Sequence, residues 1–131
     1  MTLHTTVGLV FLGLNLVLAA WAFVIYRRRQ TELPSPFWSV LWITFWLFAF
    51  QAATGILFLL RGLHPRTPLH FLYVGLAAVT VIVQIVLLPT GRIGTMFREE
   101  GRIREPGMYA SLCLLAMLFA LRLWMTGALG F

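Results

Sequence analysis

Residues 37–60, with the sequence FWSVLWITFWLFAFQAATGILFLL, contain no charged side chain. An α-helix crosses the hydrocarbon core of a bilayer with about 20 predominantly apolar residues, so this stretch is long enough to span it. Three further apolar stretches qualify, at about 7–26, 70–89 and 108–129. Their apolar residues are continuous rather than alternating, which indicates helices. The sequence therefore predicts an all-α integral membrane bundle: four transmembrane helices with antiparallel neighbours, in a single domain over residues 1–131.

The composition makes lipid the expected solvent. The chain is 60% hydrophobic and 11% charged, with a mean hydropathy of +0.90. A soluble domain usually has about a quarter of its residues charged. The ten basic residues are all Arg, the four acidic residues are all Glu, and the net charge is +6. Because the Arg lie in connections beside apolar spans, we interpret them as a topology signal and expect the lipid bilayer, not nucleic acid, as the partner.

The distribution of Arg predicts the orientation. The first connection holds three, at positions 27, 28 and 29, and the third holds four, at 92, 98, 102 and 104. The second connection holds only Arg61 and Arg66. The positive-inside rule places the first and third connections in the cytoplasm and both termini outside. Since basic residues follow the first span rather than precede it, we expect an uncleaved anchor in a bacterial-type inner (plasma) membrane.

Turn-forming residues predict the helix ends. Ser35-Pro36 is typical of an N-cap followed by proline at the first helical position. Pro89-Thr90-Gly91 ends the third span, and Glu105-Pro106-Gly107 opens the fourth with a carboxylate suited to a helix N-terminus. Glycines make the 90–107 connection flexible, and its Ile93, Met96 and Phe97 are expected at the lipid headgroups.

Polar and small residues inside a span usually face other helices. The residues expected to face inward are Gly8, Asn15, Ala19, Ala22, Thr44, Gln51, Gly55, His70, Tyr73, Ala77, Gln84, Ser111, Arg122 and Thr126. Asn15 and Gln51 should lie at similar depth and approach each other, either as a structural hydrogen bond or as part of a polar pocket. Cys113 is expected to be a buried apolar side chain.

Arg122 lies inside the outer end of the fourth span, and a charge at that depth is costly unless it is relieved. All four Glu lie on the cytoplasmic side. We therefore expect the guanidinium to face the bundle or a partner and to meet an anion or several carbonyls. Snorkelling to the interface is the alternative.

The three histidines all fall on the outer side. Imidazole and thioether groups are ligands for haem iron and copper, so His70, His64 and Met125 form a candidate metal set. The candidate cofactor-binding residues are His70, His64, His4, Arg122, Arg61, Arg66, Gln51 and Asn15. The alternative is that these histidines only cap a loop at the interface. Gln51-x-x-x-Gly55 followed by His70 at a helix start resembles four-helix haem modules such as those of cytochrome b561 and haem A synthase, although the paired intramembrane histidines of such modules are absent.

Three functions stay open at this point. The leading hypothesis is a non-catalytic subunit or accessory protein of a larger membrane complex, respiratory or photosynthetic, joined to other membrane subunits or to itself. The second is an electron-transfer protein holding b-type haem or quinone near the outer face. An oligomeric small transporter is the third, although no carboxylate lies within a span to couple it to protons. Trp38, Trp42 and Trp46 recur every four residues, either to pack on lipid or a subunit or to stack on a cofactor. No motif indicates an enzyme acting alone.

Overall fold

The computed structural model describes residues 2–101 and 104–129, and within these ranges it contains helices and loops but no strand. Four long helices alternate in direction: α1 (Thr2–Arg27), α2 (Ser35–Leu60), α3 (Leu69–Val86) and α5 (Glu105–Trp124). The short α4 (Arg92–Glu99) precedes α5, and a π-helical turn, η1 (Met125–Leu129), follows it. Each of the four long helices is long and apolar enough to cross a membrane. The predicted all-α bundle of four membrane spans is confirmed.

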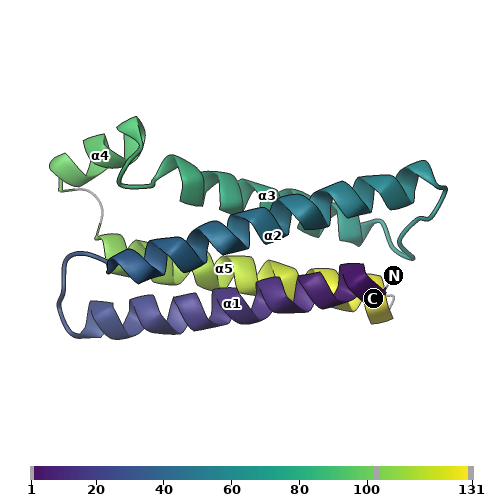
Figure 1. Cartoon of the computed structure of the whole chain (residues 1–131), viewed down its shortest axis with the longest axis horizontal. Helices are drawn as coiled ribbons and strands as arrows, with labels where there is room; N and C mark the ends of the chain where they lie inside the picture. Colours follow the sequence, from purple (N-terminus) through teal and green to yellow (C-terminus); the bar gives the residue numbers. More distant parts are fainter. Residues whose placement is uncertain (1, 102–103, 130–131) are drawn as a thin grey trace.

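The connections between the helices lie at two opposite ends of the bundle. The start of α1 and the π-helical turn η1 lie at the same end as the α2–α3 connection, whereas the α1–α2 connection and α4 lie at the opposite end (Figure 1). We call these the outer and inner ends, after the predicted orientation. Both Arg-rich connections are therefore at the inner end, as the positive-inside count requires. The side of the membrane on which each end lies remains a prediction.

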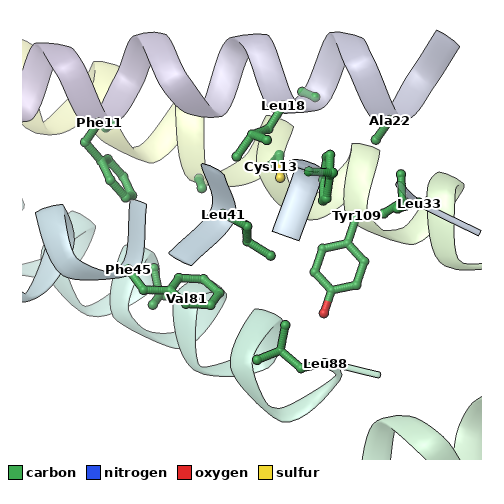
Figure 2. Packing of buried hydrophobic residues seen from close by; sticks show 14 of the residues in the cluster. Phe11, Leu18, Ala22, Leu33, Leu41, Phe45, Val81, Leu88, Tyr109 and Cys113 are labelled. Atoms are coloured by element: carbon green, nitrogen blue, oxygen red, sulfur yellow. The ribbon is translucent and has the colours of Figure 1, made fainter. Parts of the chain in front are cut away.

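The last of the four long helices, α5, is central in space. α5 packs against both α1 and α3, and α2 packs against α1. α2 and α3 are consecutive, but they meet mainly through large side chains such as Phe45 and Val81 (Figure 2). The contacts between the spans therefore do not follow the order of the spans along the chain.

Small side chains let α1 and α5 approach closely. Ala22 on α1 and Cys113 and Ala116 on α5 are completely buried. Between lipid-facing helices, van der Waals packing of this kind drives association, because lipid tails are as apolar as the side chains they contact. Larger residues complete the core toward the inner end, among them Leu18, Leu33, Leu41 and Tyr109 (Figure 2).

The helix ends differ from the predicted ones by a few residues. α2 begins at Ser35, so Pro34 is its N-cap and Pro36 lies in its first turn rather than at its first position. α5 begins at Glu105, as its carboxylate suggested. The connection predicted to be flexible contains α4, an amphipathic helix whose Ile93 and Met96 are exposed.

Most of the predicted inward faces are confirmed. Asn15, Thr44, Ala77, Gln84 and Thr126 are buried. Ser111 is an exception: it is exposed, and its hydroxyl donates to the Gly107 carbonyl of its own helix at 3.0 Å. A hydroxyl that bonds back to the preceding turn needs no partner helix, which explains how Ser111 tolerates its outward position.

Candidate functional site

Two sets of polar contacts lie at the outer end, around His4 and around His70, and together we call them the outer-end site. The first set joins α1 to α2. The His4 Nδ1 atom lies 2.8 Å from the Thr54 Oγ1 atom, and Gln51 Nε2 donates to the His4 carbonyl at 2.8 Å. The imidazole also meets the Phe58 ring edge-on, with 5.3 Å between centroids. Glycine at position 8 leaves space for the side-chain amide of Gln51, since a Cβ there would lie 3.1 Å from Gln51 Nε2. These contacts hold the first turn of α1, so the helix begins at Thr2 and not near residue 7.

The second set joins α3 to the end of α5 around His70. The His70 Nδ1 atom lies 3.1 Å from Thr126 Oγ1. Gly127 leaves space for the imidazole, because a Cβ at that position would lie 3.3 Å from His70 Cε1. His4 lies in the first turn of α1 and His70 in the first turn of α3. At the outer end, one histidine therefore joins α1 to α2 and the other joins α3 to the end of α5.

The hydrogen-bond pattern favours the same tautomer for both imidazoles. Thr54 Oγ1 donates to the Gln51 carbonyl at 3.0 Å, and Thr126 Oγ1 donates to the Arg122 carbonyl at 2.9 Å. A hydroxyl has one proton, so each threonine oxygen is left to accept from the histidine Nδ1–H. The Nε2 atom of each ring then carries the free lone pair. Metal-binding histidines are commonly oriented in this way by a partner on the other ring nitrogen.

Arg122 meets an aromatic side chain. Its Nε donates to the Tyr73 hydroxyl at 3.3 Å, and its guanidinium carbon lies 5.3 Å from the centroid of the Tyr73 ring. Its Nη1 is 4.0 Å from the Met125 sulfur. The guanidinium faces α3 and meets no anion or carbonyl of the described residues. Because all four Glu lie on the predicted cytoplasmic side, the expected anion would come from outside this chain, and it stays a prediction. The negative face of a phenol ring can relieve part of a cation's desolvation without a formal charge.

The predicted hydrogen bond between Asn15 and Gln51 is absent. Asn15 Nδ2 donates to the Phe11 carbonyl at 2.9 Å, while Gln51 bonds to His4, more than two turns of α1 away. The side-chain oxygens of both amides are buried and have no partner among the described residues. Both amides do face the bundle. The error was in the register of α2 against α1, which composition does not specify.

Other predicted site residues stay apart from this cluster. His64, Arg61 and Arg66 are exposed in the α2–α3 connection. The Met125 sulfur contacts Arg122 rather than a histidine. Within the described ranges, no three His, Cys, Asp or Glu side chains come together as a possible metal site.

A second polar network, at the inner end, was not predicted. Arg98 Nε on α4 lies 2.6 Å from Glu105 Oε2 at the start of α5, with only 19% and 8% of the two side chains exposed. The other Glu105 oxygen accepts the Leu33 backbone N–H at 2.9 Å, and Arg98 Nη1 donates to the Leu87 carbonyl at 2.7 Å. One carboxylate thus ties α4, α5 and the α1–α2 connection together. Arg98 had been counted only as a topology charge.

A third set of polar contacts lies in the core beside this network. The Tyr109 hydroxyl donates to the Gln84 carbonyl at 2.7 Å, which joins α5 to α3 near the end of that helix. The Gln84 amide lies 3.6 Å from the sulfur of Cys113, and Cys113 is buried as expected. These contacts satisfy buried polar groups and present none of them to a ligand.

Comparisons with known proteins found no counterpart for this chain. No protein-family model, no curated protein and no solved structure matches it.

Proposed function

We propose that this protein is a non-catalytic subunit or accessory protein of a larger membrane complex, and that it docks through α2. The observation that carries this proposal is Trp46. Its side chain is 72% exposed although it lies near the middle of α2, at the depth of the hydrocarbon core. Tryptophan normally sits at the membrane interfaces, where its N–H reaches water or headgroups.

The indole N–H of Trp46 needs an acceptor that this chain does not supply. No described residue forms a hydrogen bond or ring contact with Trp46. Lipid tails offer no acceptor either, and an unpaired polar group in hydrocarbon is costly. A neighbouring helix with a carbonyl, hydroxyl or amide at this depth would satisfy it.

The residues around Trp46 fit a helix partner. Trp42, Ala49, Phe50 and Ala53 are also exposed and lie on the same stripe of α2. Alanines at this spacing let a second backbone approach closely, and the aromatic rings supply large contact areas beside them. α2 is also the least buried of the four spans.

Copurification of matched variants tests the proposal. The protein would be isolated in mild detergent from its native membrane as the unaltered chain and as Trp46→Ala and Val79→Ala. Val79 is 59% exposed on α3 and serves as the control. We expect a stoichiometric protein partner that Trp46→Ala loses and Val79→Ala retains. Isolation of the unaltered chain without any stoichiometric protein would overturn the proposal.

The outer-end site supports a second candidate, an electron-transfer role with a bound haem. Its basis is the pair of imidazoles, His4 and His70, each held through Nδ1 with Nε2 free. A visible absorption spectrum of the purified protein tests this candidate directly. A Soret band that disappears in His70→Ala but persists in His64→Ala would support it, because His64 is exposed and serves as the control. A spectrum without a Soret band would eliminate the haem.

A further inference from the structure

Two adjoining cavities open at the inner end, between α1 and α5. One has a volume of about 540 Å³ and is lined mainly by Phe23, Tyr26, Met108 and Ala110. The other has a volume of about 460 Å³ and lies toward the α1–α2 connection. Tyr26 and Arg104 line both, so the two cavities form one groove, which we call the α1–α5 groove.

A glycine shapes the wall of this groove. A Cβ at position 107 would lie 3.1 Å from two carbons of the Tyr26 ring. With glycine there, the ring lies directly against the first turn of α5, and its phenol reaches the border between the two cavities. The groove is therefore defined by packing between two helices rather than by a loop.

The second cavity is basic. Arg27, Arg29 and Arg104 line it and no carboxylate does. None of the three forms an ion pair with a described residue. Three guanidinium groups around one cavity repel one another unless an anion lies between them, and guanidinium pairs well with phosphate oxygens in bidentate geometry.

The backbone of Arg29 adds an independent observation. Its φ is +58°, in the left-handed region that normally takes glycine. The Gln30 N–H bonds to the Ile25 carbonyl and the Arg29 N–H to the Tyr26 carbonyl, which is the Schellman ending of a helix. An L-residue in this conformation costs about 1–2 kcal/mol. Arginine at this position therefore lowers the stability of the helix end and places a positive charge in the second cavity.

We propose that the α1–α5 groove binds one anionic phospholipid. The phosphate lies among the three arginines, and an acyl chain runs along the first cavity past Phe23 and Met108. The arrangement fits the depth of each part, because the arginines follow the end of α1 at the headgroup level and Phe23 lies about one turn deeper. Anionic lipids are concentrated in the cytoplasmic leaflet, which is where the predicted orientation places this end.

Native mass spectrometry of the full chain, released from vesicles of phosphatidylglycerol and phosphatidylcholine with matched acyl chains, tests the proposal. We expect one retained phosphatidylglycerol and no retained phosphatidylcholine. Arg104→Gln should lower the retained fraction about fivefold, the effect of one arginine on anionic-lipid binding. The control is Arg92→Gln, which removes the same charge at the same end, from an exposed residue of α4 outside the groove.

Arg29→Gly separates the site from general folding effects. Glycine suits the left-handed conformation, so this variant should keep or raise the melting temperature while it loses phosphatidylglycerol. Equal loss of lipid in Arg92→Gln and Arg104→Gln would overturn the proposal in favour of diffuse attraction to the basic surface. Displacement of the lipid by millimolar inorganic phosphate alone would assign the groove to a free anion and overturn the lipid assignment.

Discussion

The Arg98 guanidinium and the Glu105 carboxylate form an ion pair of 2.6 Å that fastens α4 to the first turn of α5. The same carboxylate accepts the Leu33 N–H, so three segments depend on a single acidic side chain. Removal of one member of a largely buried pair leaves the other charge uncompensated, which costs far more than loss of an exposed pair.

Glu105→Gln should therefore destabilise the protein by about 2–3 kcal/mol, measured by thermal unfolding in detergent micelles. Arg98→Met combined with Glu105→Gln should cost less than the sum of the two single changes, because the double variant strands no charge. Glu99→Gln is the control, since Glu99 is exposed and outside the network. Additive costs in the double variant would contradict the ion pair.

Gly94→Ala should displace α4 from the end of α3. A Cβ at this position would clash with the Leu88 carbonyl and lie 2.7 Å from the Leu87 carbonyl. Overpacking of this kind costs about 1–3 kcal/mol, and faster proteolysis in the 90–107 connection would report the displacement. Gly75→Ala is the matched control: nothing lies within 4 Å of its Cβ, so a gain of about 0.5–1 kcal/mol in helix stability is expected. Unchanged proteolysis of Gly94→Ala would show that α4 is not seated as described.

Tyr109→Phe should cost about 1 kcal/mol, the net value of a neutral hydrogen bond, because the bond to the Gln84 carbonyl is lost and the packing of the ring is kept. Tyr109→Ala should cost about 3–5 kcal/mol, since it also leaves a cavity among Phe37 and Trp38. Both values are accessible by unfolding in micelles. Equal costs for the two variants would mean that the ring contributes no packing energy.

Arg122→Leu should change the stability of the isolated bundle by less than about 1 kcal/mol, because an exposed guanidinium over an aromatic ring contributes about 0.5–1 kcal/mol. Tyr73→Leu should have an effect of the same size, and the two changes together should not be additive. A much larger loss for Arg122→Leu in the native membrane than in micelles would reveal an anion supplied by another subunit.

Single-cysteine labelling in intact cells tests the orientation. After replacement of Cys113 by Ala, a cysteine at Thr67 should react with a membrane-impermeant reagent from outside and a cysteine at Gln30 should not. The expectation follows from the seven Arg in the first and third connections against two in the second. Labelling of the cysteine at position 30 from outside would show that the orientation is the reverse of the predicted one. The α1–α5 groove would then face the outer leaflet.

The sequence predicted the spans well because a long apolar run has few alternatives in a membrane. It predicted Pro89-Thr90-Gly91 as the end of the third span, and α3 ends at Val86 just before it. It did not predict α4, since eight residues with a glycine in the middle are too short to show a convincing helical period. The 90–107 connection was predicted to be flexible because of its glycines.

The candidate sites were predictable only in part. The histidines were correctly placed at one end, yet their partners, Thr54 and Thr126, depend on how the helices are rotated about their axes. The contact between Arg122 and Tyr73 was not predicted, because it depends on how α3 and α5 are rotated toward each other. The α1–α5 groove depends on contact between the first and the last span, and no local sequence pattern predicts which spans pack together.

The central position of α5 has a consequence for biogenesis. Because synthesis runs from the N-terminus, α1, α2 and α3 leave the ribosome before α5, yet α1 and α3 each pack against α5. Until then, the small-residue faces around Ala22 and Ala77 lie open to lipid or to any other helix that fits them. The first three spans thus expose the surfaces of α1 and α3 that α5 later covers. An insertion chaperone or another membrane helix would bind these surfaces most readily during that interval.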